Sequence, residues 1–281
     1  MRGIESAYAA GVVHPAVGAA LAVWDERLRD VAFVNLVTRS APMGPVPAEV
    51  VRSTFYNANP DLIASIIPAI WQLASPEQLL AAQAAAFAPV LAAAVQSMDA
   101  SDLAELARLS RAAAEAGAQH TEGRPLFAGL ASLPWPDGDH MVIWHAAKLL
   151  REHRGDGHVA LLTADGLTGV DALVVHTAFD GFPADAVRLS RRWDEASWGA
   201  SMATLRGRGW LTDDDAPTLT DHGRQRRQWI EDRTNELALP SFEPLGQAGV
   251  NRMTTLGTTL THALFDAGMV PAHYRPAPRA E

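Results

Sequence analysis

The stretch from Trp193 to Leu239 constrains the fold more than any other part of this chain. Trp198, Met202 and Leu205 recur at i, i+4 and i+7, which places three apolar side chains on one face of a helix. Asp194 precedes them, and its carboxylate suits the free backbone N–H groups of a first helical turn. The pattern predicts an amphipathic helix that begins after Asp194.

A turn and a second helix follow this first helix. Leu211 and Leu219 flank a tight acidic turn, which predicts a small two-stranded ribbon. Thr220 is placed to cap a further helix, and Pro240 ends it. Helix, ribbon and helix in this order are the layout of a winged helix-turn-helix.

Four stretches carry a resemblance to known families. "LRGRGWLTDDDAPTLTDHGRQ" resembles the end of the recognition helix, the wing and the next helix of a MarR-type regulator. "RSAPMGPVPAEVVRSTFYNANPDLI", "GRPLFAGLASLPWP" and "IWHAAKLLREHRGDGHVALL" resemble an uncharacterised, mainly actinobacterial helix-turn-helix family over roughly residues 15 to 240. The resemblance implies a fold and brings no established activity, so it assigns no catalytic residue.

The rest of the sequence predicts helices joined by proline- and glycine-rich turns. With 281 residues, 48 % of them hydrophobic, the chain is long enough for two modest domains. We predict a mainly α protein with a loose lead-in over residues 1–15, a helix over 140–153 and a turn over 154–158. The predicted domains are an N-terminal helical domain (1–122), a connector (123–139), a winged-helix-like domain (140–240) and a C-terminal helix with a frayed tail (241–281).

Composition limits the cellular location of the protein and the kinds of reactive group and metal site that it can contain. The absence of cysteine excludes disulfides, thiolate nucleophiles and cysteine-bound metals. The first residues lack an apolar signal core, and we expect no run long and apolar enough to span a membrane. We therefore expect a cytoplasmic protein with no membrane partner, no metal and no cofactor.

Titratable side chains gather between residues 140 and 158, with a further histidine downstream. His145 and Glu152 fall on one face of the predicted helix. The candidate ligand-binding residues of this group are Trp144, His145, Glu152, His158 and His176. A structural network that ties helices together explains the same residues, and ligand contact, acid–base catalysis and metal binding are the alternatives. No histidine spacing typical of a metal site supports the last one.

A second group follows the apolar run that ends at Val37. Arg39 lies at the end of this predicted helix, where a guanidinium needs an anion from the protein or from a ligand. Phe55, Tyr56 and Asn57 are candidates to line a pocket with it. The alternative is that Arg39 pairs with Glu49 or Asp61, Asn57 caps the next helix and the aromatic side chains belong to the core.

DNA binding is the third possibility. Arg191, Arg192, Arg206 and Arg208 are candidates for phosphate contacts. Asp213, Asp214 and Asp215 would face the phosphates at the tip of the ribbon, which disfavours DNA. Residues 141–281 hold 15 Lys and Arg against 18 Asp and Glu, so this half of the chain is not basic.

These observations lead to three hypotheses. The first is a small-molecule-binding protein, or an enzyme of specialised metabolism, on a repurposed winged-helix scaffold with a pocket between its two halves. The second is a ligand-responsive MarR-like regulator that binds DNA as a homodimer. The third is a structural module that binds a partner through its terminal helices. No reaction and no catalytic residue follow from the sequence.

Overall fold

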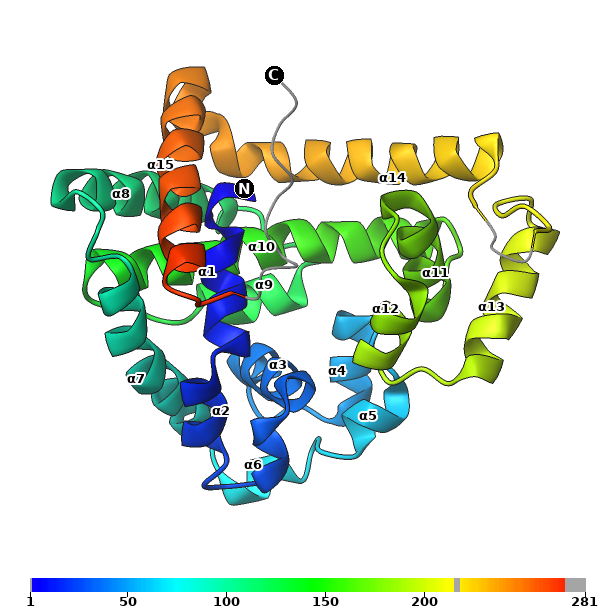
Figure 1. Ribbon diagram of the computed structural model, residues 1–281, viewed down its shortest axis with the longest axis horizontal. Helices are drawn as coiled ribbons and strands as arrows, with labels where there is room; N and C mark the ends of the chain where they lie inside the picture. The colour runs from blue at the N-terminus through cyan, green and yellow to red at the C-terminus, as the bar shows by residue number, and fades with distance from the viewer. Residues whose placement is uncertain (1, 215–217, 271–281) are drawn as a thin grey trace. The chain divides into compact units, whose positions relative to one another are not determined.

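The computed structural model describes residues 2–214 and 218–270, and these residues form helices joined by short turns (Figure 1). The mainly α class is therefore confirmed. The chain divides into two compact units: unit 1 comprises residues 1–45, 70–153 and 239–281, and unit 2 comprises residues 46–69 and 154–238. The predicted frayed tail from Pro271 and the third aspartate of the acidic turn, Asp215, lie outside the described residues.

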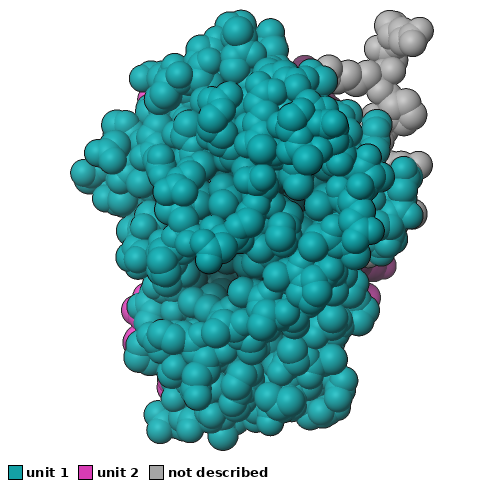
Figure 2. All heavy atoms as spheres, turned by 90° about the vertical axis from the view of Figure 1, so that its left-hand side faces the viewer, with its two compact units in different colours: residues 1–45, 70–153, 239–281 teal, residues 46–69, 154–238 magenta. Residues whose placement is uncertain are grey.

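Unit 1 is assembled from three separate stretches of chain (Figure 2). Its elements are α1 (Arg2–Val13), α2 (Pro15–Leu21), η1 (Glu26–Arg29), α3 (Val31–Ser40), η2 (Ala41–Met43), α6 (Ile70–Leu73), α7 (Pro76–Ala94), α8 (Ala100–Gly117), α9 (Pro125–Ala131), α10 (Asp139–Ala164) as far as residue 153, η3 (Leu239–Leu245) and α15 (Gly246–Asp266). The side chains of Phe87 and Phe127 are fully buried in its core.

The predicted loose lead-in over residues 1–15 is wrong, because α1 and the start of α2 occupy these residues. Ile4 and Ala7 of α1 are buried, and α1 packs along α15 (Figure 1). The two helices cross where Gly3 meets Gly257: a Cβ on Gly257 would lie 2.8 Å from the Gly3 carbonyl carbon. Glycine at the crossing lets the two backbones approach, and the apolar area buried there orders a segment with few sequence signals of its own.

Helix α7 begins as its sequence predicts. Ser75 and Gln78 form a capping box, with Pro76 in the first turn. The expectation that no run is long and apolar enough to span a membrane is wrong. By length and composition alone α7 meets this test, with a mean hydropathy of 1.2. Helices α10 and α11 (Gly169–Asp180) pass it only as a pair, and the pair is bent by 104°. A core helix of a soluble protein passes the same test, so one such helix is weak evidence.

Unit 2 contains α4 (Ala48–Phe55), α5 (Pro60–Ala64), α10 from residue 154, α11, α12 (Ala184–Ser190), α13 (Glu195–Gly207) and α14 (Asp221–Ala238). Its core brings together Trp198 and Leu205 of α13, Trp210 from the following turn and Ile230 of α14. The apolar spacing recognised in the sequence is therefore the buried face of α13.

The predicted two-stranded ribbon is wrong, because no strand occurs within residues 2–214 and 218–270. Leu211 and Leu219 do pair, but only as one isolated antiparallel bridge. The Thr212 amide donates to the carbonyl of Thr218, and the Thr220 amide to that of Trp210. Both leucines are buried in the core of unit 2, so packing holds this turn together without a ladder of strand hydrogen bonds.

The predicted turn over residues 154–158 is also wrong, because α10 continues through it to Ala164. Glycines at 155 and 157 each cost about 1 kcal/mol in a helix. Contacts with α14 hold this segment helical: Arg154 Nη2 donates to Glu231 at 2.6 Å, and His158 Nδ1 lies 2.9 Å from Thr234 Oγ1. Tertiary contacts outweigh the local preference of glycine here.

Candidate functional site

The α12–turn–α13 segment of unit 2 is the first candidate site. Asp194 is the N-cap of α13, and its Oδ1 accepts a hydrogen bond from the Ser197 amide at 2.6 Å. Trp198, Ser201 and Leu205 form the buried face of α13, which packs on α11. The opposite face of α13 is therefore the one that meets solvent.

Residues from the 46–69 segment hold the turn between α12 and α13. Asn59 Nδ2 donates to the Arg192 carbonyl at 2.8 Å, and the Asn59 amide donates to the Arg191 carbonyl at 3.2 Å. Trp193 Nε1 donates to the Asn57 carbonyl at 2.9 Å, and the Tyr56 hydroxyl donates to the Leu167 carbonyl. Asn57 and Tyr56, predicted to line a pocket, thus have structural partners within unit 2.

Arg192 adopts a φ of 58°, a left-handed conformation that glycine takes without strain and other residues rarely take. The two hydrogen bonds from Asn59 fix the backbone at this point. The result is an arginine held at the tip of a helix-turn-helix corner.

The exposed face of α13 carries small side chains. Ala196, Ala200 and Ala203 are exposed at i, i+4 and i+7. No arginine, lysine, asparagine or glutamine lies on this face between residues 195 and 205. Alanine methyl groups can contact the methyl group of thymine in a major groove, whereas hydrogen-bond readout of bases needs longer polar side chains.

The arginines after this face donate hydrogen bonds to backbone carbonyls. Arg206 donates to Thr212 at 3.2 Å and to Asp214 at 2.8 Å. Arg208 donates to Gly166 at 2.9 Å and to Asp165 at 2.7 Å. The structure therefore already uses part of the hydrogen-bonding capacity of both arginines. The residues of unit 2 include 11 arginines against 16 Asp and Glu, so the unit is acidic as a whole.

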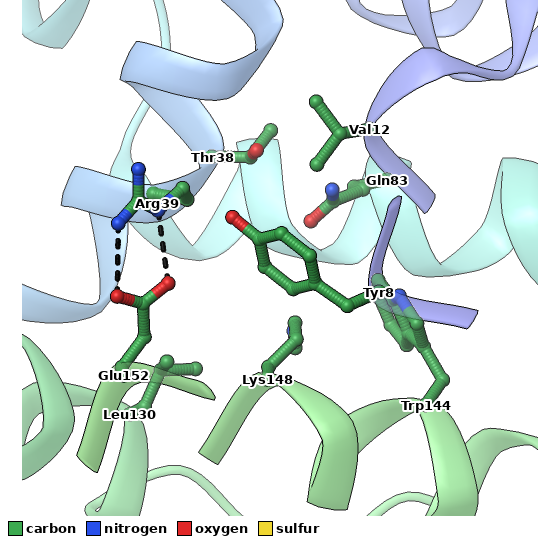
Figure 3. A pocket seen from close by; sticks show the side chains of 9 residues that line it. All are labelled: Tyr8, Val12, Thr38, Arg39, Gln83, Leu130, Trp144, Lys148 and Glu152. Carbon is green, nitrogen blue, oxygen red and sulfur yellow. Dashed lines mark hydrogen bonds and ion pairs between the residues drawn. The ribbon is translucent and has the colours of Figure 1, made fainter. Parts of the chain in front are cut away.

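A buried ion-pair cluster in unit 1 is the second candidate site (Figure 3). Glu152 of α10, with a side chain 2 % exposed, accepts two hydrogen bonds from Arg39 of α3, from Nε at 2.9 Å and Nη2 at 2.8 Å. Arg151 adds a contact at 3.3 Å. Burial alone would raise the pKa of Glu152, but the two guanidinium charges outweigh it and hold the pKa below its ordinary value. Arg39 therefore pairs with a carboxylate of the chain, as one of the two alternatives expected, but the partner is Glu152 and the predicted partners Glu49 and Asp61 are wrong.

Lys148 lies one helical turn before Glu152 and one turn after Trp144. Its Nζ lies 3.9 Å from the centroid of a Trp144 ring. Burial lowers the pKa of Lys148 to about 8, although the Glu152 charge acts to raise it. These residues line a small hollow with Tyr8, Val12, Thr38, Gln83 and Leu130 (Figure 3). The space accessible in it is about that of one water molecule.

The candidate histidines are buried or partly buried in separate units. His145 of unit 1 packs edge-on against Trp135, and burial lowers its pKa to about 3. In unit 2, burial lowers the pKa of His158 to about 4, and the charge of Arg227 adds to this effect. His176 lies 2.8 Å from Asp180 on α11, and burial lowers its pKa as well. These imidazoles are neutral near pH 7, as an interior role requires.

The predicted ligand residues divide between the units. Four of them belong to unit 1: Arg39, Trp144, His145 and Glu152. Arg39, Trp144 and Glu152 line its hollow. The remaining predicted residues belong to unit 2: Phe55, Tyr56, Asn57, His158 and His176. Their part in a common pocket stays a prediction. Lys148 was not among the predicted ligand residues, although it is the one lysine of a chain with 22 arginines.

Comparison with known proteins identifies the family. Residues 1–271 match a family model described as a helix-turn-helix family. No curated protein and no solved structure matches the chain. Because the family match spans nearly the whole chain, the protein belongs to this helix-turn-helix family.

Proposed function

We propose that the protein is a DNA-binding regulator whose α12–turn–α13 segment contacts the major groove. The observation that carries the proposal is the exposed face of α13 within a helix-turn-helix chain. Its apolar face packs in the core, and beyond the exposed Glu195 of the first turn its outer face carries the small side chains of Ala196, Ala200 and Ala203. A helix with such a face can approach base edges closely. This reverses the preference for a small-molecule function that the acidic turn suggests.

Arg191 and Arg192 are the arginines on which we expect affinity to depend. They lie in the turn between α12 and α13, just before the N-cap Asp194 of the helix that would enter the groove. Arg206 and Arg208 donate hydrogen bonds to backbone carbonyls, and a phosphate contact would have to share these donors. With two phosphate contacts, affinity should fall about 10-fold between 50 mM and 200 mM salt.

Fluorescence anisotropy with the DNA upstream of the protein's own coding sequence tests the proposal. We expect binding that exceeds binding to a shuffled duplex and weakens with salt. Arg191→Ala and Arg192→Gly should each reduce affinity by about 10-fold, within the roughly 1–3 kcal/mol of a good polar contact. Arg108→Ala is the matched control, since it removes an exposed charge from α8 in unit 1. Equal affinity for both duplexes, or equal losses in all three variants, would overturn the proposal.

The MarR-type likeness of residues 205–225 extends the proposal to a ligand-responsive homodimer that acts in the cytoplasm. Light scattering of the full chain with and without DNA measures the number of copies. A monomer on a single half-site would refute the dimer and leave DNA binding intact.

Small-molecule binding through residues of both units stays a prediction. The hollow in unit 1 holds about one water molecule and has no room for a metabolite. The buried charges around it therefore call for a different explanation.

A further inference from the structure

The outer face of α13 offers methyl groups to a partner and few hydrogen-bond donors. Ala196, Ala200 and Ala203 are exposed on it. Thr204 is exposed beside them, and its Oγ1 donates to the Ala200 carbonyl at 3.0 Å, so the hydroxyl proton is already used within the helix. The remaining chemistry of this face is apolar contact, with the Thr204 oxygen as a hydrogen-bond acceptor.

The face is also open to close approach. A Cβ on Gly199 or on Gly207 would meet no atom within 4 Å, so the space beside both glycines is empty. Glu195 lies in the first turn with its side chain 89 % exposed, and Arg188 of α12 donates to it at 3.5 Å. Residues 196–205 contain no charged side chain. A surface that reaches α13 beyond its first turn therefore meets methyl groups and backbone.

This surface chemistry selects among the bases of a major groove. Thymine presents a methyl group there, and alanine contacts that group without any hydrogen bond. Every base pair also presents polar groups, but a G·C pair offers no methyl group in exchange. A polar base edge that loses water against alanine and gains no partner lowers the affinity. The face should therefore favour thymine and disfavour G·C pairs.

The spacing of the alanines sets the length of DNA that they can reach. Ala196 and Ala203 are separated by seven positions, which is about 10 Å along the helix axis. Successive base pairs are about 3.4 Å apart. A helix that follows the groove can therefore present this alanine stripe to about three or four consecutive base pairs.

We propose that α13 reads a short run of thymines, in which Ala196, Ala200 and Ala203 each pack against a thymine methyl group. The inference rests on the proposed DNA binding and specifies its target. Contacts from Arg191 and Arg192 to phosphates would position the protein without reading sequence, because the backbone is the same at every base pair. The alanine stripe is thus the part of the α12–turn–α13 segment to which we assign the sequence preference.

Replacing thymine by deoxyuridine tests the proposal, because this change removes the 5-methyl group and leaves the protein as it is. Selection from a random duplex library with the full chain supplies the preferred duplex, and fluorescence anisotropy compares it with versions that carry deoxyuridine at single positions. We expect the preferred duplex to contain a run of thymines. Each methyl group that contacts an alanine should contribute about 4-fold in affinity, and three together roughly 60-fold. Thymines outside the run should be insensitive.

Ala200→Gly assigns the contact to α13. This variant lacks the alanine methyl group, so one of the deoxyuridine losses should disappear while the others stay. Ala85→Gly is the matched control, since it removes an exposed methyl group from α7 of unit 1 and should keep every loss.

The outcomes separate the target from DNA binding itself. Affinity for the preferred duplex that equals affinity for a shuffled one would refute DNA binding and the thymine contacts together. A preferred duplex without a run of thymines, or one that tolerates deoxyuridine at every position, would refute the thymine contacts and leave DNA binding intact. Identical deoxyuridine losses in Ala200→Gly and the wild type would show that Ala200 makes no such contact.

Discussion

Breaking the Arg39–Glu152 pair gives the sharpest test of the cluster in unit 1. Glu152→Leu removes a carboxylate that is 2 % exposed and leaves the Arg39 guanidinium, itself 17 % exposed, without its bidentate acceptor. Removal of one partner of a buried pair costs roughly 3–5 kcal/mol, because the remaining charge stays desolvated. The cost should lie at the upper end, since Arg151 and Lys148 also lose the Glu152 charge.

The double variant Arg39→Met/Glu152→Leu separates this effect from a simple loss of packing. Replacing both partners by apolar side chains of similar size removes the uncompensated charge, and such replacements are often neutral or stabilising. We therefore expect the double variant to be more stable than Glu152→Leu alone by about 2 kcal/mol or more. The coupling energy from the complete cycle should be of the same order.

Urea unfolding of the wild type, both single variants and the double variant, followed by tryptophan fluorescence, measures these differences. Trp144 lies in the same cluster and reports on unit 1. Arg111→Ala/Glu115→Ala is the control cycle, since this pair on α8 has both side chains about half exposed and should couple by less than about 1 kcal/mol. Additive losses at Arg39 and Glu152 would refute the argument that buried, uncompensated charge dominates.

Three further predictions concern single positions. Gly169→Ala should destabilise unit 2 by at least ~2 kcal/mol in urea unfolding, because a Cβ there would overlap the Tyr56 carbonyl; Gly199→Ala, with open space around it, should leave stability unchanged or raise it by up to ~1 kcal/mol. Asp194→Ala should cost about 1 kcal/mol through loss of the α13 cap, and Asp194→Asn should recover most of it. His145 has a folded-state pKa of about 3, below the ordinary 6.5, so the unfolded chain binds more protons between these values and stability falls as pH drops through this window. Between pH 7 and pH 4.5, His145 should contribute roughly 2–3 kcal/mol to the loss in the free energy of unfolding. The variant His145→Phe should lack this contribution, so its stability should fall by that much less than the stability of the wild type.

The sequence predicted the elements whose signals are local. The cap at Asp194, the capping box at Ser75 and the apolar face of α13 all depend on residues within a few positions of one another. The failures came where distant contacts override local preference. Two glycines predicted a turn inside α10, but contacts with α14 keep this segment helical. The first residues of the chain carry few local helix signals, and they form a helix because they pack against α15.

The candidate site shows the same division. A guanidinium at Arg39 that needs an anion followed from its position after an apolar run, but its partner, 113 positions away, could not be identified from spacing. The role of the 46–69 segment was equally hidden, because its hydrogen bonds to the α12–α13 turn join residues more than 130 positions apart. The single lysine was visible in the composition, and its isolation among 22 arginines is the signal that could have drawn attention to it.

The conformation of Arg192 links stability to the proposed function. A left-handed conformation costs a residue with a Cβ roughly 1–2 kcal/mol, and glycine would adopt it without that cost. Strain of this kind persists where surrounding contacts enforce it, here the two hydrogen bonds from Asn59, and it often marks a functional position. If the guanidinium contacts DNA, Arg192→Gly should stabilise the protein and weaken DNA binding at the same time. If the strain has a functional origin, the two measurements must change in opposite directions. Replacement of a purely structural arginine would instead lower the stability of the protein or leave its DNA affinity unchanged.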